Sequence, residues 1–230
     1  MTPKKWILSV AFTAFALAMT QAQVSFGLRG GYQTTTIQTT QGLDDLTPDP
    51  TFVNAFSVAG VVQIPVAGGL SFQPELVYNR KGFSIRESTG ANLFNVSVPV
   101  GVRVIPQFDS LDLPLLANYS FGDENVKAFL MAGPSFGYAL NGRLTTKAQL
   151  LLDLDLGTTN LNLDQLGYER FEVSGVLGAG VSFQTSVGQL FLDARYQHGF
   201  TQLYDIPLFD EKMRNQGLAF NIGWTMPLTK

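Results

Sequence analysis

The sequence predicts an all-β protein: an eight-stranded antiparallel up-and-down transmembrane β-barrel with short periplasmic turns and long extracellular loops. Three observations predict this class. Apolar and polar residues alternate with a period of 2 over eight segments. Most of these segments have about ten residues or more, the length that crosses a bilayer at a tilt. Tight joins alternate with long polar stretches between them, which is typical of barrels in the outer membrane of bacteria.

The eight expected strands follow one another along the chain after residue 22. In order, they are 25–33, 54–66, 70–79, 111–121, 126–140, 171–184, 190–197 and 218–228. In the first, Phe26, Leu28 and Tyr32 lie opposite Arg29 and Gln33. The other seven alternate in the same way, and in the last the apolar face runs from Leu218 to Leu228. We therefore expect each strand to have one apolar and one small or polar face.

The connections support the barrel. Tight joins at 67–69, 122–125 and 186–188 separate the second strand from the third, the fourth from the fifth and the sixth from the seventh. The long stretches are 34–53, 83–110, 141–168 and 201–215. An even number of strands places both ends of the barrel domain on the periplasmic side. Strands in lipid must close into a ring, because lipid cannot form hydrogen bonds with the backbone of an unpaired edge strand.

The N-terminus has the pattern of a secretory signal peptide. Lys4 and Lys5 precede an apolar run, and small residues such as Ala22 mark a cleavage site. The run is shorter than the about 20 apolar residues of a transmembrane helix, although a retained anchor is the alternative. We expect a signal peptide at 1–22, one barrel domain at 23–230, and export to the outer membrane.

Composition excludes several other classes of protein. Removing Lys4 and Lys5 with the signal takes the formal charge from -3 to -5, so a basic surface for nucleic acid is not expected. Cysteine is absent, which excludes disulfides, thiol chemistry and a lipid-modified anchor. Charged residues make up 14% and the mean hydropathy is +0.13. After the signal, no apolar run has the length of a transmembrane helix.

Charged residues fall on the polar faces, which should line the lumen. This predicted lumen charge network consists of Arg29, Glu75, Lys81, Asp112, Glu172, Asp193 and Arg195. One interpretation is a path for protons or ions; the other is a set of salt bridges that plugs the barrel and stiffens it. The plug is favoured, because an eight-stranded interior has room for side chains and not for a water channel. Aromatic residues on the apolar faces, such as Tyr78 and Tyr138, could form interfacial girdles.

Two long inserts also alternate and should form strands or hairpins that project past the membrane. Their apolar positions are Val96, Val98, Val100 and Val102 in the first insert, and Leu152, Leu154 and Leu156 in the second. Each insert would have an apolar face that something must cover. Either the inserts pack on each other as an external cap, or they dock a partner protein. A ninth membrane crossing at 96–104 would break the even count of strands.

No residue pattern indicates an enzyme or a metal site. His198, the single histidine, is expected on the outer face, whereas the nearest strand serine, Ser174, points inward. The acidic residues at 44–49 and 153–164 do not have the spacing of a calcium loop. We predict no catalytic, cofactor-binding or metal-binding residue, and no small-molecule substrate is identified.

Six segments resemble the PorT-like outer-membrane β-barrel family of Bacteroidetes. They are "FGLRGGYQTT", "SFQPELVYNRKGF", "LDLPLLANYSF", "MAGPSFGYAL", "GVLGAGVSF" and "LFLDARYQHGFTQLYD". The resemblance covers nearly all of 23–230 and implies a small outer-membrane barrel. Most members of this family lack an assigned activity, and one branch is linked to export of surface proteases by the type IX secretion machinery. No single motif in the resemblance is catalytic.

The expected function is therefore structural or interactive, within an envelope or type IX secretion assembly. Outer-membrane lipid is the expected surrounding, and a secretion or envelope protein is the expected partner. Two alternatives remain: a barrel enzyme that acts on lipid or peptide, and a soluble lipocalin-like carrier. The carrier would turn its apolar face inward around a ligand.

Overall fold

The computed structural model describes residues 23–38, 51–93, 96–149, 153–165, 167–202 and 214–228. For 38, 85–93, 96–102, 149 and 153–155, the description covers the backbone only. The predicted signal peptide at 1–22 lies outside the described residues, as do 39–50 and 203–213 of two predicted loops. Among the residues that the structure describes, no helical segment has the length and hydropathy needed to cross a membrane.

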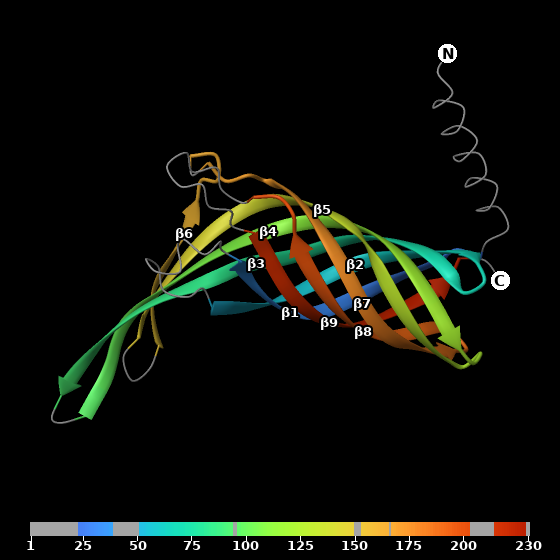
Figure 1. The fold of residues 1–230 in the computed structure, drawn as a ribbon, viewed down its shortest axis with the longest axis horizontal. Coiled ribbons are helices and arrows are strands. Elements are labelled where there is room, and N and C mark those ends of the chain that lie inside the picture. The colour runs from blue at the N-terminus through green and yellow to red at the C-terminus, as the bar shows by residue number, and fades with distance from the viewer. Residues whose placement is uncertain are drawn as a thin grey trace, which may run out of the picture.

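The described chain forms a closed antiparallel β-barrel. The strands are β1 (Ser25–Gln38), β2 (Thr51–Ala67), β3 (Leu70–Leu93), β4 (Val96–Gly122), β5 (Val126–Gln149), β6 (Asp153–Leu161), β7 (Phe171–Thr185), β8 (Gly188–Gly199) and β9 (Arg214–Pro227). Eight of them pair in a ring in chain order, and β9 closes the ring on β1. β6 is outside this ring, because it pairs only with the last residues of β5, from Gly142 to Gln149. The predicted eight-stranded up-and-down barrel is confirmed (Figure 1).

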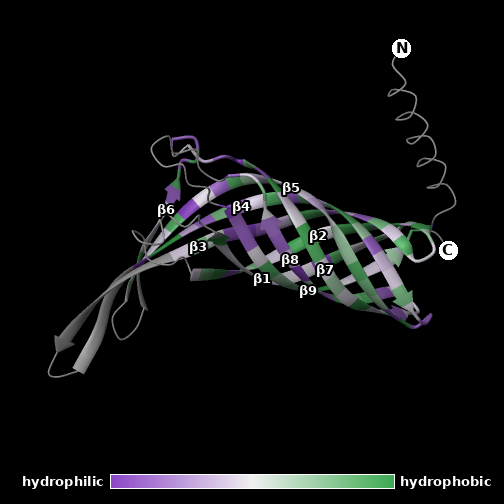
Figure 2. Ribbon diagram, in the orientation of Figure 1, coloured by the Kyte–Doolittle hydropathy of each residue, from purple (hydrophilic) through white to green (hydrophobic). Residues whose placement is uncertain are grey.

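Alternation places the two faces as the sequence predicts. Leu28, Phe56 and Leu177 point outward, with exposed fractions of 62%, 78% and 63%. Polar and charged side chains of the same strands are buried inside, and Figure 2 shows the resulting alternation of hydropathy along the strands. This arrangement is the reverse of the one that a soluble carrier needs, since a carrier turns its apolar face inward.

The short connections lie at one end of the barrel. Gly68 and Gly69 turn between β2 and β3 with φ values of 54° and 86°, a backbone region that favours glycine. Residues 122–125 and 186–187 make the other two tight turns. Aromatic side chains are exposed near these turns, as at Tyr119, and toward the opposite end, as at Tyr78 and Tyr138. This distribution is the one that two interfacial girdles require.

The structure corrects the prediction of a long loop at 83–110. β3 continues to Leu93 and β4 begins at Val96, so most of this stretch is a hairpin paired from Gly82↔Gln107 to Leu93↔Val96. The valines at alternate positions explain the result, because β-branched residues favour extended backbone in any strand. The strand-forming interpretation of 96–104 is confirmed, and the ninth crossing is wrong, since these residues begin β4.

Three strands of the ring continue past it on the loop side, and β6 adds to them. We call this part the extension: β3 after Phe83, β4 before Phe108, β5 after Asn141, and β6. β4 and β5 stay paired up to Gly101↔Gln149, and β6 adds to β5 from Gly142↔Leu161 to Gln149↔Asp153. In Figure 1 the β3–β4 hairpin and β6 project from the barrel at the end away from the tight turns.

Candidate functional site

The first group of lumen charges is centred on Glu75. Its Oε2 accepts hydrogen bonds from Arg29, at 3.1 and 2.8 Å, and from Arg195 at 2.9 Å. Arg195 also donates to both carboxylate oxygens of Asp193, at 2.8 and 2.9 Å. Asn221 accepts from Arg29 at 2.5 Å and donates to Asp193 at 2.6 Å. β1, β3, β8 and β9 are therefore joined across the lumen by one set of charges.

The second group is centred on Lys81. Its Nζ lies 2.8 Å from Asp112 Oδ2 and 2.8 Å from Glu172 Oε2, so it bridges β3, β4 and β7. Asn79 donates to Asp112 at 3.1 Å, and Asn215 donates to Glu172 at 3.2 Å. These amides supply hydrogen bonds to the carboxylates in addition to the charge of the lysine.

All seven residues of the predicted lumen charge network are buried, and each forms a salt bridge with another member. The structure divides them into two groups: Arg29, Glu75, Asp193 and Arg195 in one, and Lys81, Asp112 and Glu172 in the other. Because an unpaired charge in such an interior is costly, each member depends on its partners. Removing one partner of a buried pair typically costs about 3–5 kcal/mol.

Inward-facing glycines provide the room that these side chains occupy. A Cβ at Gly137 would lie 2.6 Å from Asp112 Oδ1, and one at Gly31 would lie 2.1 Å from Asn221 Oδ1. The remaining space is small: the lumen cavity beside Arg29, Lys81 and Arg195 has a volume of about 50 Å³. That is room for one or two water molecules.

An apolar layer fills the lumen between the charges and the tight-turn end of the barrel. It consists of Val61, Leu116, Phe129, Met131, Val176 and Phe191, all buried. This layer was not predicted from the sequence. Its signal is present in the sequence, since Val176 and Phe191 have the strand parity of Glu172 and Asp193. Gly180 and Gly223 make room for the layer, because a Cβ at either would lie within 2.4 Å of a phenylalanine ring.

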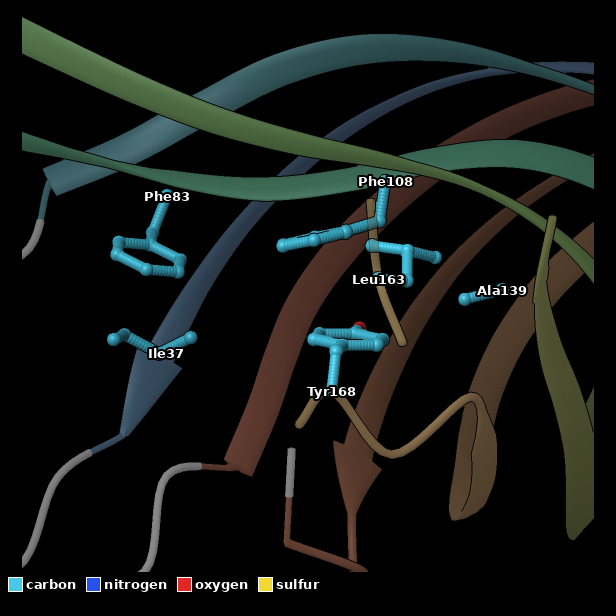
Figure 3. Packing of buried hydrophobic residues seen from close by; sticks show 6 residues of the cluster. All are labelled: Ile37, Phe83, Phe108, Ala139, Leu163 and Tyr168. Atoms are coloured by element: carbon cyan, nitrogen blue, oxygen red, sulfur yellow. The ribbon is translucent and has the colours of Figure 1, made fainter. Parts of the chain in front are cut away.

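A second apolar cluster covers the other end of the charged lumen. It contains Ile37, Phe83, Phe108, Ala139, Leu163 and Tyr168. Figure 3 shows the Tyr168 ring lying against that of Phe108, and their centroids are 4.3 Å apart at an interplanar angle of 18°. Leu163 and Tyr168 come from the segment that follows β6. We call this segment, 162–170, the cap.

Hydrogen bonds join the cap to the barrel wall at Ala139 and also form within the cap itself. The Ala139 amide donates to the Arg170 carbonyl at 2.8 Å, and the Tyr168 amide donates to the Leu163 carbonyl at 3.0 Å. Arg170 donates to both oxygens of Asp164 at 2.9 and 3.1 Å, and these bonds raise the pKa of Arg170. Part of the predicted loop 141–168 thus folds back over the barrel mouth.

A third ionic group, which was not predicted from the sequence either, lies on the outer face. Asp109 Oδ1 accepts from Arg80 at 2.7 Å, and Asp109 Oδ2 accepts from Arg143 at 2.7 Å. Arg80 has the outward parity of Tyr78, which is a usable sequence signal. The position of Arg143 follows from a β-bulge: Ser110 pairs with Ala139 but Asp109 pairs with Asn141, which leaves Leu140 unpaired.

The model of the outer membrane protein beta-barrel domain matches residues 19–205, most of the chain. The chain belongs to this family. It is therefore an outer membrane β-barrel protein, in agreement with the apolar outer face and the closed ring. No curated protein matches it.

Solved structures of other small barrels resemble this outer membrane barrel over most of its length. One is Ail, the attachment invasion locus protein of Yersinia pestis, in complex with the heparin analogue sucrose octasulfate. Its sequence is 12% identical to this chain, and the TM-score is 0.40. The match covers 89% of this chain and 99% of Ail. Neisserial surface protein A is 15% identical with a TM-score of 0.39, covering 86% of this chain and 96% of that protein.

Of the other predicted features of the outer membrane barrel, the docking residues are described only in part, whereas His198 and Ser174 are fully described. Among the predicted docking residues, Leu156 is 63% exposed. Leu152 lies outside the described residues, and the side chains of Val96, Val98, Val100, Val102 and Leu154 are not described. His198 lies on the outer face between Tyr196 and Phe200, and its Nδ1 is 3.3 Å from the Tyr196 hydroxyl. Ser174 is buried in the lumen, where it accepts a hydrogen bond from Gln197.

Acidic residues do not gather into a metal site in the part of the chain that the structure describes. Of those in the predicted acidic loops, Asp164 pairs with Arg170. The residues at 44–49 and the side chains of Asp153 and Asp155 lie outside the described part.

Proposed function

We propose that this protein is a plugged, non-enzymatic outer-membrane barrel of the PorT-like kind, and that it presents its extension to a protein partner. The partner would belong to an envelope or type IX secretion assembly in a Bacteroidetes-like cell. The six resembling segments support the family branch. The barrel would act as a rigid wall that holds the extension at a fixed place on the cell surface.

The observation that carries the proposal is the contrast between the lumen and the extension. The lumen contains two groups of paired charges between two apolar clusters, and its cavity of about 50 Å³ is too small for a conducting path. By contrast, β3 and β4 have 24 and 27 residues, far more than the 9–11 or so that a bilayer crossing requires. The chain therefore extends a large ordered sheet outside the membrane.

The proposal of a protein partner is tested by shortening the β3–β4 hairpin at its tip. Removing 88–101 and joining Glu87 to Val102 through a two-residue turn keeps the register, because Glu87 pairs with Val102. Both forms are used for affinity capture from detergent-solubilised membranes. The matched control replaces the periplasmic turn residues Ser186 and Val187 with Asn-Gly. A secretion or envelope component captured by the intact and control chains, and lost from the shortened chain, supports the proposal. Equal capture by all three overturns it.

The plugged lumen is tested separately by conductance in planar lipid bilayers. We expect no sustained ion current through the folded protein, because the paired side chains fill the interior. A stable open-channel current from the unmodified protein would overturn the plug. It would leave the partner proposal intact, so the two parts can fail independently.

A further inference from the structure

The third ionic group lies directly beyond the lipid-facing aromatic residues. On the outer face, Tyr78 pairs with Leu111 and Leu111 pairs with Tyr138. Two residues further along β3 and β4, Arg80 pairs with Asp109. Two strand residues span about 7 Å. The polar headgroup region on each side of a bilayer is of similar thickness, about 5–8 Å. The ionic group therefore lies at the depth of the outer-leaflet headgroups.

The geometry of this group is suited to an anion. Asp109 is 2% exposed, and its two oxygens each accept from a different arginine. The side chains of Arg80 and Arg143 remain 35% and 41% exposed. A guanidinium has five N–H donors in a planar fork, and these two bonds use one donor of each arginine. One buried carboxylate thus holds two outward-facing guanidiniums side by side, and the three groups together carry a net positive charge.

The same outer face continues into the extension, where it forms a concave surface. Gln107 lies two residues before Asp109 in β4, so it shares the same face, and it pairs with Arg143. Together with Arg103 and Thr145 it lines a cavity of about 480 Å³ between the extension and the start of β2. Arg103 donates a hydrogen bond to Ser84 at 2.6 Å. Gln107, the strand partner of Arg143, thus connects the ionic group to a hollow with room for a sugar-sized group.

We propose that Arg80 and Arg143, held by Asp109, bind the phosphate of a phosphorylated glycolipid in the outer leaflet. Planar guanidiniums match phosphate oxygens in paired hydrogen bonds, and basic residues at headgroup depth attract anionic lipids. The sugar of the headgroup would occupy the hollow beside Gln107. This site goes beyond the proposed partner function and rests only on the outer-membrane location of the barrel.

The test measures lipid binding to the full-length folded protein. The protein in mild detergent is titrated with a diphosphorylated glucosamine lipid (lipid A), and bound lipid is counted by native mass spectrometry. Each basic residue near an anionic surface contributes about 1 kcal/mol, or roughly fivefold in affinity. Arg80→Gln combined with Arg143→Gln should therefore weaken binding by at least about tenfold. The matched control is Lys127→Gln combined with Arg170→Gln, which removes the same charge at the periplasmic end and on the cap.

The Asp109→Asn variant separates a built site from general attraction. It makes the patch more positive, so non-specific attraction would strengthen lipid binding, whereas loss of the carboxylate that orients both arginines should weaken it. A gel-mobility shift on heating confirms that each variant is folded. Unchanged binding by the double arginine variant, equal weakening by the control, or tighter binding by Asp109→Asn would each overturn the proposal. So would displacement of the lipid by equimolar inorganic phosphate, which would indicate a site for the free anion.

Discussion

Arg29 and Arg195, from strands β1 and β8, donate hydrogen bonds to the same oxygen of Glu75, at distances of 2.8 to 3.1 Å. Two cations meet at one buried carboxylate, and Asp193 balances the second of them. The two arginines and two acids together are neutral, so loss of any one of the four leaves a net charge in the lumen. That dependence makes Glu75 the most informative position in the lumen for mutation.

Glu75→Gln should lower the free energy of unfolding by about 3–5 kcal/mol, because Arg29 and Arg195 would lose a buried countercharge. Urea unfolding in phosphatidylcholine vesicles measures this change. Asp164→Asn serves as the control, since Asp164 forms its salt bridge with Arg170 at the exposed cap. We expect the control to unfold close to the unmodified protein. A similar loss in both variants would argue against a special role for the lumen charges.

Gly137→Val should reduce the yield of folded barrel, whereas Gly30→Val should not. A Cβ at Gly137 would lie 2.6 Å from Asp112 and 3.5 Å from the Lys81 ammonium, but a Cβ at Gly30 would have no atom within 4 Å. Overpacking of this kind costs about 1–3 kcal/mol before any charge is displaced. The fraction that shifts in mobility on heating measures the folded yield. Normal folding of Gly137→Val would mean that the ion group can move aside.

Leu177→Arg should destabilise the barrel by about 2–4 kcal/mol, the cost of a lipid-facing cation near the middle of the bilayer. Leu156 has the same exposed fraction, 63%, but belongs to β6 in the extension. Leu156→Arg should therefore have little effect on unfolding in the same vesicles. Equal effects of the two substitutions would contradict the boundary between barrel wall and extension.

Tyr168→Ala should open the cap without unfolding the barrel. The lost stacking on Phe108 is worth about 1 kcal/mol in addition to the lost burial of the ring, so the population of the open cap should rise by at least roughly fivefold. Hydrogen exchange of the amides at 163–168 measures this change, while the amides of β7 should keep their protection. Tyr119→Ala, at an exposed lipid-facing tyrosine, is the control and should leave cap exchange unchanged. Faster exchange in both regions would mean that the cap and the barrel open together.

Period-2 alternation was sufficient to place every strand of the ring, because lipid outside and charge inside impose opposite demands on alternate residues. It also placed Arg29 and Asp193 on the inner face. It did not predict which charges pair, since Arg29 and Glu75 are 46 residues apart and meet only through the tilt and curvature of the closed ring.

The ends of the strands were less predictable. Alternation continues from the membrane into the extension, so nothing in the pattern of 83–110 marks where lipid ends and solvent begins. The β-bulge at Leu140 shifts the parity of β5 and turns Arg143 toward Asp109. The cap was missed because Leu163 and Tyr168 lie outside any strand, where periodicity carries no information.

The charged group around Glu75 also crosses the seam at which the chain's first and last strands meet. Arg29 belongs to β1 and donates a hydrogen bond to Asn221 of β9, and these two strands are neighbours only once the ring has closed. An open sheet in hydrocarbon would expose an arginine and an acid that lack some of their hydrogen-bond and salt-bridge partners. Closing the ring and neutralising its interior are therefore a single step. A partly closed barrel is destabilised both by unpaired strand edges and by unpaired charges.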